Sequence, residues 1–145
     1  MFEINKTNTP MQTTSEYLLL FRGTNWHKGL SPTEIQKVMT QWRAWFNGLE
    51  AEGKVKGGLP LMNEGKVVSG ADGRLVVDGP FAESKEAIGG YFLIAVADFD
   101  EAVAIAKQCP GLKYGAAVEI RPVAEECAAM EIARQAEAEL EGASV

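Results

Sequence analysis

Two uninterrupted apolar runs dominate the hydrophobic pattern along the chain. Residues 16–22 read EYLLLFR and end at Gly23, and residues 90–97 read GYFLIAVA. Runs that do not alternate are typical of strands that bury both faces, so we predict two central strands of a sheet. Gly89 and Gly90 open the second run, and they fit a β-bulge and a close approach to a ligand equally well.

A third predicted strand, residues 116–123, does alternate. Val118 and Ile120 form its apolar set and should face the helices. Glu119 and Arg121 then lie on the opposite face, where charges are costly unless they are paired or bound to a ligand. For Glu119 and Arg121, the sequence therefore supports a salt bridge and a ligand site equally.

Helical spacing of apolar residues appears in three further segments. Residues 31–53 open with SPTE, which supplies a capping serine, a proline for the first helical position and a capping-box glutamate. Residues 98–110 open with DFDE, in which Asp98 and Glu101 repeat the capping-box spacing, and Pro110 stops this helix. A shallower, alanine-rich stripe predicts a last helix from about residue 124 to residue 141.

The segment between the first helix and the second apolar run supplies the remaining strands. Residues 54–61 are predicted to be extended, and residues 66–69 and 74–77 flank a glycine-bounded turn and form a small hairpin. The resulting βαββαβ order predicts an α+β, ferredoxin-like antiparallel sheet, with a hairpin insert and an additional C-terminal helix.

This arrangement has a consequence for assembly. Helices would cover one face of the sheet, yet both central strands are apolar at every position of their cores. Their second face would expose an apolar patch of roughly several hundred Å², which monomers rarely do. We therefore expect self-association through that face to give a homodimer.

Composition narrows the classes of protein that remain. The chain of 145 residues fits one domain, and it holds one histidine and two distant cysteines, Cys109 and Cys127. We expect reduced thiols, no metal site and no cofactor, since most zinc and iron sites need several imidazoles or paired cysteines. No apolar run is long enough to cross a membrane, and residues 1–15 carry no signal-peptide pattern, so we expect a cytoplasmic protein with no membrane partner.

The net charge of −6 is concentrated at one end of the chain. Residues 124–145 hold six Glu and one Arg, whereas the rest is nearly neutral. Without a basic patch, nucleic acid is a poor partner. We expect a flexible segment at residues 1–15, a domain at 16–123 and an acidic helix at 124–145.

Residues 78–110 read DGPFAESKEAIGGYFLIAVADFDEAVAIAKQCP, a run that resembles the signature of the YCII-related family in its DGPF branch. EYLLLFR and EIRPV at 119–123 are similar to that family's first and last strands. The resemblance implies a dimeric α+β barrel, in which two ferredoxin-like sheets face each other across an interior. Genes of this branch often lie beside sigma-factor genes, so the resemblance also favours a regulatory role.

The same resemblance bears on catalysis. The stricter YCII branch carries a His on its first helix and an Asp before a Pro near the end of its second. By spacing, those places fall on Trp42 and Cys109 of this chain. The acid–base pair implied for that branch is thus absent here. We also expect Trp42 to be a core residue, since it lies on the apolar stripe of its helix.

Five side chains are candidate ligand contacts: Arg22, His27, Asp78, Glu119 and Arg121. His27 could act as a base, but a solvated loop position is the alternative that we favour. For Asp78, the first residue of DGPF, we favour turn formation over a ligand contact. The other three could line the barrel interior, either as a structural ion pair or as a site.

Two hypotheses of function follow. The first is a non-catalytic homodimer that binds a small organic ligand or acts as a regulator. The alternative is a metal-independent enzyme, with acid–base or monooxygenase- or isomerase-like chemistry in the barrel interior. The absence of the His/Asp pair favours the first hypothesis.

Overall fold

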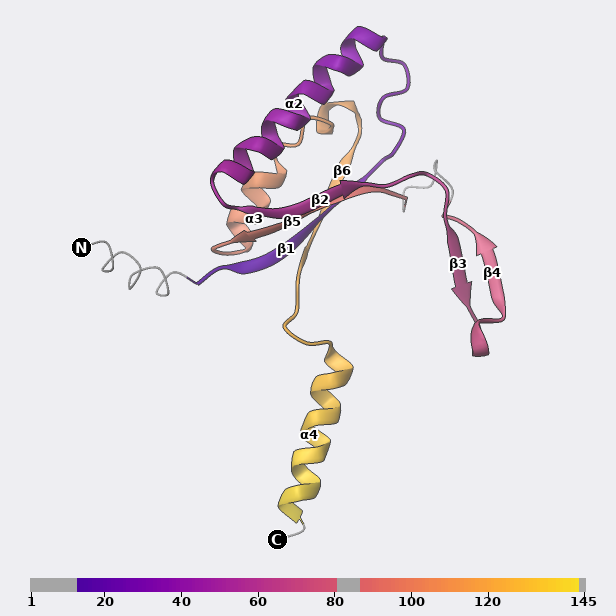
Figure 1. Cartoon of the computed structure of the whole chain (residues 1–145), viewed down its shortest axis with the longest axis vertical. Helices are drawn as coiled ribbons and strands as arrows, with labels where there is room; N and C mark the ends of the chain where they lie inside the picture. The colour runs from indigo at the N-terminus through magenta and orange to yellow at the C-terminus, as the bar shows by residue number, and fades with distance from the viewer. Residues whose placement is uncertain (1–12, 81–86, 144–145) are drawn as a thin grey trace, which may run out of the picture.

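A computed structural model describes residues 13–80 and 87–143 of the chain, and its elements are labelled in Figure 1. In chain order these are β1 (Ser15–Arg22), α2 (Pro32–Ala51), β2 (Val55–Pro60), β3 (Lys66–Ser69), the 3-10 turn η2 (Ala71–Gly73), β4 (Leu75–Asp78), β5 (Ile88–Val96), α3 (Phe99–Ala106), the 3-10 turn η3 (Leu112–Tyr114), β6 (Ala117–Pro122) and α4 (Ala128–Ala143).

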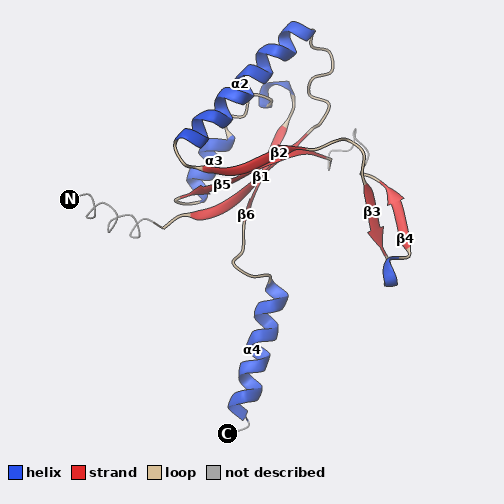
Figure 2. Ribbon diagram, viewed as in Figure 1, coloured by secondary structure: helices blue, strands red, loops and turns tan. Residues whose placement is uncertain are grey.

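Four strands form an antiparallel sheet in the order β2-β5-β1-β6, and β3 pairs with β4 in a separate hairpin. Figure 2 shows α2 and α3 packed on the sheet, while α4 and the hairpin extend away from it, opposite α2. The α+β, ferredoxin-like prediction is therefore confirmed, together with the hairpin insert and the additional helix. None of the described helices is both long and apolar enough to span a membrane.

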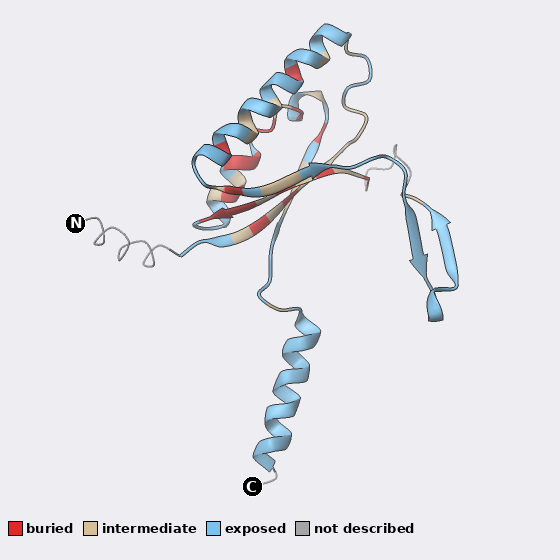
Figure 3. Ribbon diagram, viewed as in Figure 1, coloured by how far each residue is buried: buried red, intermediate tan, exposed pale blue. Residues whose placement is uncertain are grey.

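The two apolar runs are the central strands, as the sequence predicts. Along β1, every second residue from Tyr17 to Phe21 is buried against the helices, and Leu19 is completely enclosed. On β5, Phe92 and Ile94 face the same side. Both α2 and α3 contribute to this cluster, so the core lies between the helices and one face of the sheet (Figure 3).

The opposite face of the sheet, called the open face below, is also apolar. Leu18 lies opposite Leu93, and Leu20 lies opposite Tyr91. All four side chains are only half-buried. The prediction that both strands are apolar on both faces is confirmed, and the second face is left partly in water.

Capping fixes where the two covering helices begin. At α2 the full capping box is present, since Ser31 Oγ accepts from the Glu34 backbone N–H at 3.2 Å and Glu34 Oε1 accepts from the Ser31 N–H at 2.9 Å. At α3, Asp98 caps the Glu101 N–H at 2.8 Å. Glu101 itself accepts from the Ala97 N–H at 2.8 Å, not from Asp98 as the capping-box spacing predicts.

Two other expectations need correction. Trp42 packs against the core cluster but is only half-buried, because it also lines the pocket described below. The last helix begins at Ala128, later than predicted, and all of its described residues are exposed, since an alanine stripe offers little surface to bury. Residues 1–12 of the expected flexible segment lie outside the described part, so the segment stays a prediction, and β1 begins at Ser15.

Glu101 supports a prediction on pH and stability. The Ala97 N–H and the Lys54 ammonium, which lies 3.0 Å away, lower the pKa of the Glu101 carboxyl below its usual 4.5. Because the unfolded chain then binds more protons near pH 4.5, this carboxylate stabilises the fold above that pH, and the contribution is lost as pH falls through the lowered value. We expect Glu101→Gln to lower the free energy of unfolding by less than about 1 kcal/mol at pH 7.

Urea unfolding of the wild type and the variant at several pH values measures this difference. The two curves should converge as the pH falls below 4.5, and the exposed α4 variant Glu139→Gln serves as the control. A difference that stays constant down to the acid limit would show that the ionised carboxylate is not what stabilises the start of α3.

Candidate functional site

A pocket of about 550 Å³ lies where β1 and β2 end and β5 begins, beneath the middle of α2. This volume falls within the usual range for small-molecule sites, roughly 300–1,000 Å³. The lining residues come from the β1–α2 loop, α2, the end of β2 and the start of β5. They are Phe21, Arg22, Gly23, Thr24, Trp26, His27, Met39, Trp42, Arg43, Phe46, Gly58, Leu59, Pro60, Leu61, Asn63, Gly89, Gly90, Tyr91, Phe92 and Ala116.

Three glycines shape the strand side of the pocket. A Cβ on Gly58 would lie 2.6 Å from the Tyr91 carbonyl oxygen and 2.7 Å from Phe92 Cδ1. Gly89 is skipped in the pairing of β1 with β5, where Phe21 is opposite Gly90 and the next residue is opposite Ile88. The pair Gly89–Gly90 thus forms the bulge that was one of the two alternatives, and both glycines also line the pocket.

Aromatic rings form most of the apolar wall. Phe21 packs edge-on against Trp42, with ring centroids 4.8 Å apart, and against Phe92 at the same separation. Phe46 contacts Phe92 at 5.0 Å. Trp26, on the β1–α2 loop, adds a further ring to the lining. Edge-to-face pairs of this kind hold ring positions more firmly than area burial alone, so the wall is preformed.

Trp42 carries an unusual polar group in this wall. Within residues 13–80 and 87–143, its Nε1 is the one buried side-chain nitrogen or oxygen without a hydrogen-bond partner. An unsatisfied donor costs about 1–3 kcal/mol. By contrast, Trp45 Nε1 donates to Gln108 Oε1 at 3.2 Å. In this wall the Trp42 ring is packed against Phe21 while its N–H has no protein partner among the described residues.

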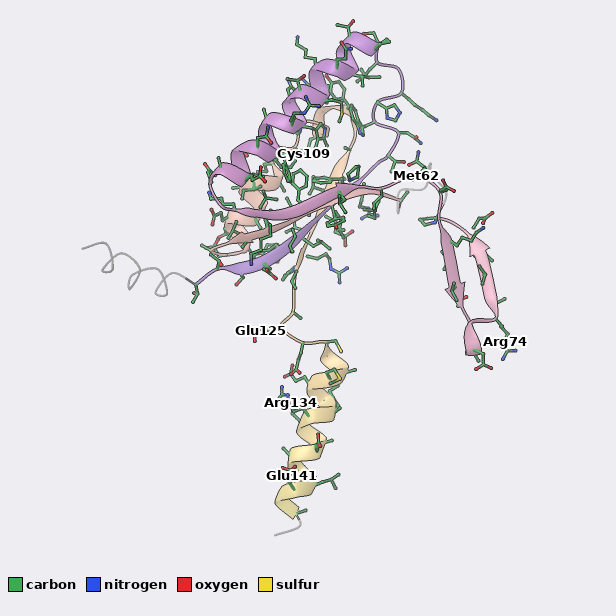
Figure 4. The ribbon with its side chains drawn as sticks, viewed as in Figure 1. Met62, Arg74, Cys109, Glu125, Arg134 and Glu141 are labelled. Atoms are coloured by element: carbon green, nitrogen blue, oxygen red, sulfur yellow. The ribbon has the colours of Figure 1, made fainter. Side chains whose placement is uncertain are left out.

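Trp42 and Cys109 both lie close to Gly111. The position of a Cβ on Gly111 would be 3.6 Å from Trp42 Cζ2 and 3.9 Å from Cys109 Sγ. Figure 4 shows Cys109 inside the body, between α2 and the sheet. Burial raises the pKa of the Cys109 thiol, and the N–H groups of Gly111 and Leu112 offset this only in part. The thiol therefore stays protonated near neutral pH.

The structure brings some of the five candidate residues together and separates others. Arg22 and His27 line the pocket. Arg22 Nη1 also binds Glu119 Oε1 at 3.2 Å, and Arg121 Nη1 lies 3.5 Å from Glu119 Oε2. Glu119 thus joins two arginines in one network at the sheet. The salt bridge that was one of two alternatives for these residues is present.

Asp78 lies apart from the pocket. It ends β4, pairs with Lys66 across the hairpin and is largely exposed. Of the other DGPF residues, Gly79 and Pro80 are joined by a cis peptide bond, and Phe81 lies outside the described residues. The described part of the chain gathers no group of three or more His, Cys, Asp or Glu side chains that could hold a metal ion.

Sequence reasoning missed the α2 side of the pocket. Met39 and Arg43 are one helical turn apart, and both line the pocket beside Trp42. Met39 follows the apolar spacing of its helix, which predicts a core position, yet 45% of its surface is exposed. A methionine followed four residues later by an arginine, on the flank of an apolar stripe, was the available signal.

Comparison with known proteins bears on the body of the chain. The protein-family model described as the YCII-related domain matches residues 16–126. Among the curated proteins no match was found. The matched range begins in β1 and ends after β6, so it includes every described residue of the pocket.

Gly58 allows a direct test of how the pocket is built. We expect Gly58→Ala to destabilise the fold by about 1–3 kcal/mol, because the added methyl group meets a backbone oxygen and an aromatic ring at less than 3 Å. Gly57→Ala is the matched control, since nothing lies within 4 Å of its Cβ position. Thermal unfolding of both variants checks the prediction, and equal stability of the two would refute the packing described for this wall.

Proposed function

Since this chain belongs to the YCII-related domain family, we propose that it acts as a non-catalytic homodimer that binds a small organic molecule in the pocket under α2. Residues 16–123 form the binding domain in this proposal, and residues 124–145 are an accessory. Two free cysteines, one buried and one exposed, fit a reducing compartment such as the cytoplasm. A ligand-dependent regulatory role is consistent with this arrangement.

The observation that carries the proposal is the pocket itself. It combines a preformed aromatic wall with a few polar side chains, Arg22, His27 and Arg43, at one end of the sheet. Sites for small molecules have this composition, in which apolar surface supplies affinity and a few polar groups fix orientation. Gly58, Gly89 and Gly90 line the same pocket, and the absence of side chains there lets a ligand approach the backbone closely, which also supports the proposal.

Binding is favoured over catalysis by the residues at the two family positions. Trp42 has no acid–base function, and Cys109 is buried with its thiol pKa raised. Nucleophilic cysteines need the opposite environment, which lowers the thiol pKa and leaves sulfur accessible. Those two positions therefore support the pocket wall rather than a reaction.

The homodimer is proposed from the open face. Leu18, Leu20 and Leu93 lie there side by side and half-exposed, and the Arg22–Glu119–Arg121 network borders them. A second copy placed on this face would remove the leucines from water and would enclose charges that are already paired.

The β3–β4 hairpin is a second reason to expect a partner copy. Its apolar side chains are exposed on both faces, between 44% and 63% of their surface: Val67, Val68, Leu75, Val76 and Val77. An isolated two-stranded hairpin is at best marginally stable in water. The hairpin extends to the side of the sheet away from α2, which is also the side of the open face (Figure 1). One partner copy could therefore cover both the hairpin and the open face.

We expect the full chain to sediment as a dimer, at about twice its chain mass of 15.7 kDa. Leu20→Glu should shift it to the monomer, because a charge on the open face would be buried without a partner. Leu112→Glu, on the turn after α3, is the control and should remain dimeric. A monomeric wild type, or a dimer that tolerates Leu20→Glu, would contradict this interface.

Native mass spectrometry of the purified full chain tests the binding proposal. The wild type should carry an additional small-molecule mass that disappears on unfolding. Met39→Trp should lose that mass, since the larger side chain narrows the pocket, and the exposed neighbour variant Gln41→Trp should retain it. Bare protein in the wild-type spectrum, or equal retention by both variants, would contradict a ligand in this pocket.

A further inference from the structure

We infer that the molecule bound in the pocket is a small aromatic acid, with a planar ring system that carries one carboxylate. This inference rests on the proposed function, because it concerns the same pocket. It goes further by naming the ligand's chemical class from the wall and the charges around it.

The aromatic part follows from the wall. Five described aromatic residues line the pocket besides Tyr91, whose side chain lies on the open face: Phe21, Trp26, Trp42, Phe46 and Phe92. Rings that enclose a site offer faces and edges to another ring, and they favour stacked and edge-to-face contacts over contacts with a branched aliphatic chain. A polar, hydroxyl-rich ligand such as a sugar would leave most of its hydrogen-bonding groups unmatched against this surface.

The charge of the ligand follows from the ionisable residues. The chain as a whole has 20 acidic and 14 basic residues. Around the pocket the balance is reversed, because the described lining includes Arg22, His27 and Arg43 and no Asp or Glu. Such a site in an acidic protein attracts an anion and repels a cation.

The basic residues have different roles. Glu119 binds Arg22 at 3.2 Å, so that guanidinium is largely neutralised. Arg43, on α2, and His27, on the β1–α2 loop, lie at the pocket from two different elements. A guanidinium presents two parallel N–H donors that match the two oxygens of a carboxylate. Arg43 is therefore the expected partner of the ligand's carboxylate, with His27 as a second donor.

Three probes separate the two parts of this inference. They are 1-naphthoate, which has both a ring system and a carboxylate, 1-naphthamide, which lacks the charge, and cyclohexanecarboxylate, which lacks the aromatic ring. In calorimetric titrations of the full chain, 1-naphthoate should bind about tenfold or more tightly than either of the others, as expected for one charge-assisted contact.

Variants identify the contact. Arg43→Gln should lower the affinity for 1-naphthoate by about tenfold and leave the affinity for 1-naphthamide unchanged. The affinity of Arg43→Lys for 1-naphthoate should be intermediate, because lysine keeps the charge but lacks the paired donors. Arg43 is exposed, so these variants should fold. Arg74→Gln, at the tip of the hairpin and far from the pocket (Figure 4), should have no effect.

Two results would overturn the inference. One is 1-naphthamide or cyclohexanecarboxylate binding as tightly as 1-naphthoate, and the other is failure of all three probes to bind. If native mass spectrometry still shows a ligand that Met39→Trp loses, only the assigned class fails and the proposed function stands. If that ligand is absent as well, both fail.

Discussion

Strands β1 and β5 carry apolar side chains on both faces, and α2 and α3 can cover only one of them. The positions of the core and of the open face both follow from this constraint. The covered face becomes the core, with Leu19 and Ile94 fully enclosed. The open face keeps Leu18, Leu20 and Leu93 half-exposed, which is why we assign it to a second copy of the chain.

The pocket lies at the end of β1 and the start of β5, next to the core. At the start of β5, the bulge at Gly89 shifts the pairing with β1, and Gly58 and Gly90 bring backbones close without side chains. The core aromatic residues Phe21 and Phe92 therefore also line the pocket, where Trp42 packs against them. Core packing and the binding wall are continuous, so a bound ring would extend the core.

Periodicity predicted the main elements because burial and capping act locally. The alternation of Val118 with Glu119 gave the correct faces of β6, and the SPTE run gave the correct start of α2. The pocket was harder to predict, because it depends on which residues of distant segments meet. Trp42 fits an apolar helix stripe, and only the packing of α2 on β1 and β5 shows that its ring also lines a pocket.

The five candidate residues show the same limit. Strand alternation places Glu119 and Arg121 on one face, but the sequence left an ion pair and a ligand site as equal alternatives there, and the ion pairs with Arg22 and Arg121 are present. His27 lines the pocket because of the path of the β1–α2 loop. A loop has no hydrophobic periodicity from which the position of this side chain could be predicted. Arg43 was overlooked because an exposed helical arginine has the same pattern whether it borders a pocket or only solvent.

The central claim is that this pocket, and no other part of the chain, receives the ligand. The indole N–H resonances of the three tryptophans test it most directly, because Trp26 and Trp42 line the pocket and Trp45 does not. In ¹⁵N-labelled protein titrated with 1-naphthoate, the Trp26 and Trp42 signals should move together, and Trp45, held by Gln108, should move least. Equal shifts of all three, or a shift confined to Trp45, would contradict the account.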